Sequence, residues 1–228
     1  MIDRSGEEAK AEYEHVMGKK VGRTFYALAA EVHLLHVKWG DYMVLYDKRS
    51  RVELLNRVAP AYFARLQDVY IHDTFLHISR LTDEPKSRSR TRLTIGGLVG
   101  MIEAHDLRRM LRPLVADMNR KVRALRSWRD RRIAHHEYDL ALGQPTEPLP
   151  LTTRAMTRSA IEAIAAVLHA VCQHYQDSDL RFRFESRPGT NALALLYCMD
   201  GGLKAAKQRE DRIAAGDYRT EDLELVDL

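Results

Sequence analysis

The chain is poor in cysteine and in uninterrupted apolar sequence. Its two cysteines among 228 residues, Cys172 and Cys198, suit neither a disulfide framework nor a zinc site. Polar residues such as Glu162 and His169 interrupt the most apolar stretches before they reach the roughly 20 residues that span a bilayer. Residues 1–20 lack the apolar segment of a secretion signal. We therefore expect a cytoplasmic protein with free thiols and no membrane association.

Several sequence signatures of enzymes are also missing. There is no glycine-rich phosphate-binding loop, no nucleophile elbow and no cysteine pair at metal-ligand spacing. His33 and His36 lie close to Glu31 on an expected helix. A metal there would need further ligands from another helix, such as His72 or His77. The sequence therefore predicts no bound metal and no cofactor.

The charge of the chain, by contrast, is abundant and unevenly distributed. The formal net charge is +4, but residues 217–228 carry five acids and one arginine. Residues 86–132 carry fourteen Lys or Arg against four Asp or Glu. A basic band of this kind attracts polyanions, of which nucleic acid is the commonest. A solvated helix face would carry similar charges, so composition alone leaves both interpretations open.

Apolar residues recur at helical spacing in the first half of the chain. From Val21 to Tyr46 they fall three or four residues apart, which predicts one long amphipathic helix. A second helix is expected from Pro60 to about Leu81, because proline suits a first turn and Pro85 ends the helix. Its expected core stripe consists of Tyr62, Leu66, Val69 and Leu76.

The second half of the chain predicts two further long helices. One should begin near Arg112, because Pro113 again suits a first turn, and should run into residues 128–136. The other is expected over Thr153–Gln176, after a rigid proline-rich loop at residues 143–150.

Shorter elements complete the pattern. Thr94 can cap a short helix, residues 86–92 should form an exposed loop, and Gly201-Gly202 should separate two helical pieces. No convincing pair of strands is present. The sequence thus predicts an all-α fold, a bundle of four main helices plus short ones over residues 1–180, followed by a helical extension with an acidic tail at 181–228.

The apolar stripe of the third long helix continues into charged residues. Met118, Val122 and Leu125 mark this stripe, and further helical steps reach Arg129 and then His136. A buried arginine or histidine needs a partner, because unpaired burial costs several kcal/mol. We expect Arg129 to pair with a carboxylate on a facing helix, to line a cleft, or to lie at an interface.

The segment that begins at Arg129 resembles the Arg-x(4–6)-His signature of HEPN domains. Arg129-Asp130 followed by Ile133-Ala134-His135 is similar to the form in the AbiU-like branch, which is linked to phage abortive infection. The segment Leu81-Thr82-Asp83 and the order of the expected helices also resemble those of this branch. The resemblance covers about Val21 to Gln176.

This resemblance implies a HEPN-like bundle that acts as a metal-independent endoribonuclease, a toxin or antiphage effector that forms a homodimer with a composite site. Arg129 would stabilise charge on the RNA phosphate, and His135 would exchange protons with the reacting oxygens. Asp130 would orient Arg129.

Two ambiguities remain at the end of this segment. The first concerns which histidine acts with Arg129. Around a straight helix His136 lies about 20° from Arg129 and His135 about 120°, so geometry favours His136. The Ala-His dipeptide of the signature favours His135. His136-Glu137-Tyr138 also resembles the His-x-Tyr ending of HEPN toxins whose tyrosine is nucleotidylated by a cognate antitoxin. Tyr138 would then be a modification site.

A second function of a different class suits the same fold. A non-catalytic, dimeric HEPN-like module would bind RNA, nucleotide or a partner protein, because function belongs to sites rather than to folds. The environment of Arg129 discriminates between the two. A basic cleft at a two-fold interface favours the enzyme, and an internal salt bridge that seals Arg129 favours the module.

Overall fold

The structure is a computed structural model that describes residues 6–87, 90–135, 137–144, 146–176, 191–217 and 219–223. These residues are almost entirely helical, which confirms the all-α prediction. The chain divides into a larger unit, Met1–Trp39 with Val69–Phe184, and a smaller unit, Gly40–Asp68 with Glu185–Leu228. The predicted domain boundary at residues 180 and 181 lies outside the described residues and stays a prediction.

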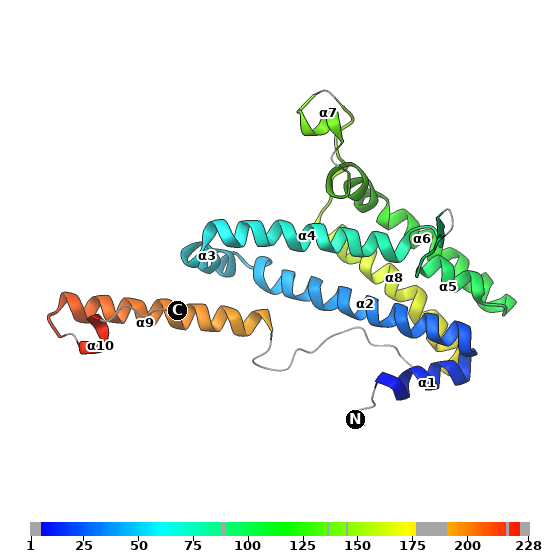
Figure 1. Ribbon diagram of the computed structural model, residues 1–228, viewed down its shortest axis with the longest axis horizontal. Coiled ribbons are helices and arrows are strands. Elements are labelled where there is room, and N and C mark those ends of the chain that lie inside the picture. Colours follow the sequence, from blue (N-terminus) through cyan, green and yellow to red (C-terminus); the bar gives the residue numbers. More distant parts are fainter. Residues whose placement is uncertain are drawn as a thin grey trace. The chain divides into compact units, whose positions relative to one another are not determined.

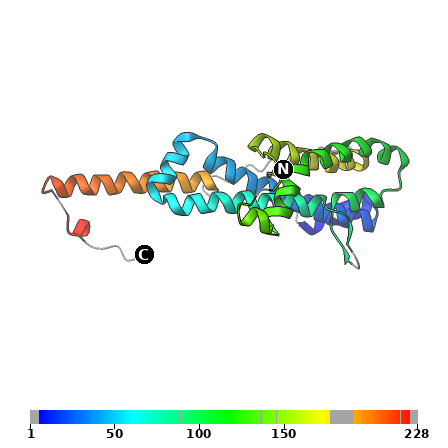
Figure 2. The ribbon, with the colours of Figure 1, turned by 90° about the horizontal axis from the view of Figure 1, so that it is seen from above.

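The larger unit is a helical bundle (Figure 1). Its elements are α1 (Gly6–Met17), the first part of α2 (Lys19–Tyr46), the second part of α4 (Pro60–Thr82), α5 (Ile95–Met101), α6 (His105–Trp128), η1 (Arg129–Ile133), α7 (Tyr138–Ala141) and α8 (Arg154–Gln176). Helices α2 and α4 lie side by side in both views (Figures 1 and 2). Helix α6 packs along α8.

Helix α2 forms where the sequence predicts it. The expected positions Phe25, Leu28, Val32 and Leu35 are completely buried. Residues three and four apart share one face of a helix, so this stripe supplies α2's contribution to the core.

Helix α4 has the predicted bounds, but the predicted core stripe is wrong. Tyr62 and Val69 are 55% and 60% exposed, and the buried apolar positions are instead Phe63, Phe75, Ile78 and Leu81. Thr74 and His77 are buried on the helix as well. Polar residues on the core side break the apolar periodicity, which explains why the sequence pattern indicated the neighbouring face.

Helix α6 begins earlier than predicted. It starts at His105, and Pro113 lies inside it rather than in its first turn. The buried positions Leu107 and Leu111 precede the proline and belong to the same apolar face as Met118 and Val122. Burial of this continuous face keeps the helix intact across Pro113, although proline lacks the backbone N–H for one helical hydrogen bond.

Helix α8 is both long and apolar. By length and composition it could cross a membrane, but this is weak evidence because the core helix of a soluble bundle meets the same criteria. The helical spacing of apolar residues predicts that Ile161, Ile164, Leu168, Val171 and Tyr175 face inward; the first four are buried and Tyr175 is half-buried. The helix therefore has a partner for its apolar face within the protein, namely α6.

A capping residue and a small hairpin precede α5. Thr94 caps the helix, since its hydroxyl accepts a hydrogen bond from the Gly97 backbone N–H at 3.1 Å, as predicted. Before it, β1 (Lys86–Ser87) pairs antiparallel with β2 (Arg90–Thr91). The segment that the sequence assigns to a loop thus contains a small hairpin.

The smaller unit contains the second part of α2, α3 (Arg49–Val58), the first part of α4, α9 (Ala192–Ala214) and α10 (Thr220–Leu223). Helix α9 continues through Gly201-Gly202, so the predicted break is wrong. Asn191 caps its start by accepting hydrogen bonds from Leu193 and Ala194. Near its end, the Arg212 guanidinium binds the buried Asp222 carboxylate and lowers its pKa to about 2.

Candidate functional site

The signature segment lies at the end of α6, where the helix changes its hydrogen-bonding pattern. Residues Arg129–Ile133 form a π-helical turn, closed by a 2.8 Å bond from the Ala134 N–H to the Arg129 carbonyl. The bond spans five residues, one more than in an α-helix, so the turn holds an extra residue. The straight-helix angles used to compare His135 with His136 therefore do not hold here. Turns of this kind occur frequently at functional sites.

Arg129 forms a bidentate ion pair with Asp83, the residue that directly follows α4. Its Nη1 donates to Asp83 Oδ2 at 3.0 Å and its Nη2 to Oδ1 at 2.8 Å. The two side chains are 21% and 13% exposed. The two segments that carry the family resemblance, around Asp83 and around Arg129, thus meet in space.

A second carboxylate lies beside Arg129. Asp130 Oδ1 is 2.7 Å from Arg129 Nε, within ion-pair distance, although this N–H is not aligned for a hydrogen bond. Each terminal nitrogen of Arg129 carries two N–H groups, and Asp83 takes one from each. Within the described part of the chain, the other two are not bonded to an acceptor.

Arg126, one turn earlier, connects α6 to the same end of α4. Its Nη2 donates to the carbonyl oxygen of Thr82, the last residue of α4. Burial lowers the pKa of Arg126, and the neighbouring Asp83 carboxylate partly offsets this effect. Phe75 of α4 also packs edge-on against Trp128, with ring centroids 6.4 Å apart. The end of α6 is thereby fixed against α4.

The loop after the signature is fixed by Trp128 and Arg131. The Trp128 indole N–H donates to the Pro150 carbonyl at 2.8 Å. Arg131 donates to the Glu137 carboxylate and, at 2.6 Å, to the Glu147 carbonyl. The hydrogen bond that Arg131 donates to Glu137 raises the pKa of Arg131. Glu137, Glu147 and Pro150 are therefore held close to the signature turn.

Of the other predicted site residues, the structure describes His135 and Tyr138. His135 is exposed in a bend directly after the π-helical turn. Tyr138 is 73% exposed and begins α7, and its modification stays a prediction. His136 lies outside the described residues. No hydrogen bond joins Arg129 to His135 within the described part of this single chain.

A cavity of about 530 Å³ lies next to the Arg129–Asp83 pair, and sequence reasoning missed it. Its lining consists of Glu31, His77, Arg80, Leu81, Asp83, Arg92 and Leu93. His77 is fully buried, and its Nε2 lies 2.9 Å from Glu31 Oε2. Burial is the main cause that lowers the pKa of His77. The sequence suggested His77 only as a possible further ligand for a metal beside Glu31, because a single histidine on a core helix has no distinctive spacing.

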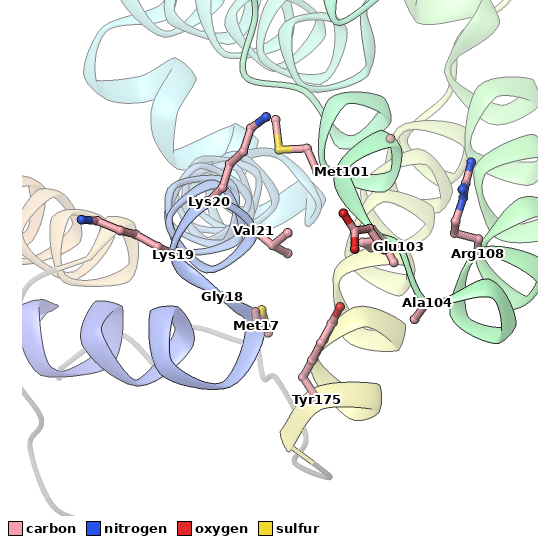
Figure 3. Close-up of a pocket in the computed structure, with 12 residues that line it drawn as sticks. Met17, Gly18, Lys19, Lys20, Val21, Met101, Glu103, Ala104, Arg108 and Tyr175 are labelled. Carbon is pink, nitrogen blue, oxygen red and sulfur yellow. The ribbon is translucent and has the colours of Figure 1, made fainter.

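A second cavity, of about 630 Å³, lies at the opposite end of α6 (Figure 3). The turn at Gly18, the α5–α6 connection and the end of α8 surround it. In Figure 3, Glu103 and Tyr175 extend toward each other, whereas Lys19 extends away from them. This cavity contains none of the signature residues. Among the described residues, no group of three or more His, Cys, Asp or Glu side chains is arranged to hold a metal ion.

A helical bundle whose signature arginine ends a long helix and meets the Leu-Thr-Asp segment defines a HEPN-type protein. The chain matches the HEPN AbiU2 family over residues 18–193 and belongs to it. Membership makes the protein a HEPN module related to abortive infection. No curated protein and no solved structure matches the chain.

Proposed function

We propose that the protein is a metal-independent endoribonuclease of the HEPN type, active in abortive infection, whose site is completed by a second copy of the chain. One observation carries this proposal. Arg129 is a fifth exposed and is fixed by Asp83 directly after α6, one N–H on each of its terminal nitrogens has no acceptor among the described residues, and the exposed His135 follows the signature turn.

The chemistry needs only these residue types and the RNA. His135 accepts the proton of the 2′-hydroxyl, whose oxygen attacks the adjacent phosphorus. The bond to the 5′-oxygen breaks, and that oxygen takes up a proton from a histidine. The products are a 2′,3′-cyclic phosphate and a 5′-hydroxyl. Arg129 stabilises the charge that builds on the phosphate oxygens in the transition state.

The second copy supplies what one chain lacks. Within the described residues no hydrogen bond links Arg129 to His135, so no direct interaction in one protomer holds the two side chains together around a phosphate. In a two-fold dimer the ends of both α6 helices would face a shared cleft, and His135 of one protomer would act beside Arg129 of the other.

The Arg129–Asp83 pair also favours a second candidate, the non-catalytic module. An arginine held by a carboxylate at two points contributes to structure without any reaction, as an internal salt bridge does. In this alternative the protein binds RNA, a nucleotide or a partner protein and does not cleave. The side chain is a fifth exposed rather than sealed, and this exposure supports the enzyme over the module.

Cleavage of RNA in the presence of EDTA tests the proposal. Wild type should cleave, and Arg129→Ala and His135→Ala should each lose most activity, because each removes a group that acts in the transition state. Arg112→Ala is the matched control, since Arg112 is an exposed arginine of the same helix away from the signature. New 5′ ends should accept phosphate directly from a polynucleotide kinase, as 5′-hydroxyls do. If wild type leaves the RNA intact, or if all variants cleave it equally, the protein is not the proposed endoribonuclease. If wild type binds the RNA and leaves it intact, the result supports the module.

A further inference from the structure

A shallow groove runs along α6 and ends at the signature turn. It encloses about 510 Å³ and is lined by Asn119, Arg123, Arg126, Ser127, Asp130 and Arg131. Asn119, Arg123, Arg126 and Asp130 follow one another at steps of three or four residues, and Ser127 lies beside Arg126, so they form one face of the helix. From first to last the face is roughly 18 Å long at 1.5 Å per residue. All its lining residues belong to the larger unit.

The charges in this groove are only partly compensated. Asp130 is paired with Arg129, and Arg131 is paired with Glu137. Arg123 is exposed and has no ion-pair partner within the described part of the chain. Arg126 bonds to a neutral carbonyl, and its Nε is buried without an acceptor among the described residues. Arg123 therefore keeps its positive charge, and the charge of Arg126, about one helical turn away, is only partly offset by Asp83, Glu84 and Asp130.

The neutral residues of the groove suit the same kind of ligand. Asn119 has an amide and Ser127 a hydroxyl, and both groups donate hydrogen bonds. Most protein contacts to a nucleic-acid backbone come from arginine, lysine and such polar side chains. None of the described residues that line the groove is aromatic and could stack on a base, so its chemistry fits phosphates and sugars rather than bases.

We infer that this groove binds the sugar-phosphate backbone of the RNA strand next to the cleaved bond, an inference that rests on the proposed function. Arg123 and Arg126 bind successive phosphates, and Asn119 and Ser127 donate to phosphate or sugar oxygens. The strand then reaches Arg129 at the end of the groove. Binding through the backbone makes the affinity dependent on salt and largely independent of sequence.

Binding of a single-stranded 2′-O-methyl RNA oligonucleotide, measured by fluorescence anisotropy, tests this inference without cleavage, because the probe lacks a nucleophilic 2′-hydroxyl. Arg123→Glu should weaken binding by roughly tenfold or more and reduce the slope of log affinity against log salt by about one. The matched control Arg112→Glu makes the same charge change on the same helix outside the groove and should change affinity less than Arg123→Glu. Ser127→Asp provides a second variant with a negative charge inside the groove.

The outcomes separate the groove from the catalytic proposal. Selective loss of binding in Arg123→Glu and Ser127→Asp supports the groove even if wild type cleaves no RNA. Equal effects of Arg123→Glu and Arg112→Glu overturn the groove and indicate a diffuse basic surface, even if wild type cleaves RNA. Absence of binding by wild type at low salt also overturns it.

Discussion

Asp83 is the residue whose importance the structure changes most. Its carboxylate binds both terminal nitrogens of Arg129 and fixes the plane of the guanidinium. In the proposed enzyme Asp83 is a positioning residue, since it acts on RNA only through Arg129. A fixed guanidinium loses less conformational freedom when it binds the transition state, and this reduces the barrier to the reaction.

Asp83→Asn should therefore reduce RNA cleavage by roughly tenfold or more, since hydrogen bonds to charged groups contribute about 1.5–3 kcal/mol. The measurement is kcat and KM with a defined RNA, beside affinity for the 2′-O-methyl probe. We expect kcat to fall while affinity for the probe is retained. Asp106→Asn is the control, because Asp106 pairs with Arg109 at the surface, 3.1 Å away, where ion pairs contribute little. Faster cleavage by Asp83→Asn would contradict this role and show that Asp83 keeps Arg129 from the RNA.

His77 predicts a dependence of stability on pH. Burial lowers its pKa below 6.5, so the unfolded chain takes up a proton at a higher pH than the folded chain does. The contribution of the neutral imidazole is complete above about pH 6.5 and is lost as the pH falls through the folded pKa. The urea midpoint of wild type should fall from about pH 7 to about pH 5, and this fall should be smaller in His77→Gln. Some dependence should remain, because burial also lowers the pKa of His36. Identical pH slopes for the two proteins would rule out His77 as a source.

At the scale of elements, the sequence predicts a helix best where its core face is uniformly apolar. Helices α2 and α8 meet this condition, and their stripes are confirmed. Helix α4 does not, because Thr74 and His77 lie on its buried side and leave Tyr62 and Val69 as the more regular apolar pattern. The start of α6 was missed for another reason. Pro113 has a strong preference for first turns, but burial of Leu107 and Leu111 overrides that preference.

The candidate site shows a similar division. The Arg129 segment and the Asp83 segment could each be recognised in the sequence, and a carboxylate partner for Arg129 was among the expectations. The identity of that partner could not be predicted, because the two residues are 46 positions apart and meet through the packing of α4 against α6. The π-helical turn was also not predictable, since no residue type in Arg129–Ile133 requires it.

Helix α9 allows a direct test of why the predicted break is absent. At Gly201 and Gly202 an added Cβ would meet no atom within 4 Å, and both residues are helical. Alanine at each position should therefore raise the free energy of unfolding by roughly 1 kcal/mol, the difference in helix propensity. Gly216 is the control, because it has similar space but a φ of +76°, and alanine there should destabilise. Thermal denaturation followed by circular dichroism measures both effects. A lower melting temperature for Gly201→Ala would show that α9 needs flexibility at this point.

At the scale of the whole molecule, the proposed function requires more than one chain. Each protomer contributes a fixed arginine and an exposed histidine, and the composite site would contain two of each. Every single substitution in a homodimer then removes a residue twice from the same cleft. Mixed dimers separate the contributions of the two protomers, because each protomer can carry a different substitution.

Mixing Arg129→Ala with His135→Ala protomers should restore part of the activity that each homodimer lacks. A mixed cleft retains one arginine and one histidine on opposite protomers, which is the minimum that the transition state needs. The two variants would carry different affinity tags, be co-expressed and be purified in sequence, so that mixed dimers alone are assayed. A dimer that carries both substitutions on one protomer and none on the other is the control for geometry. Activity in this control but not in the mixed dimer would show that Arg129 and His135 act within one chain, and failure to isolate any mixed dimer would refute the composite site.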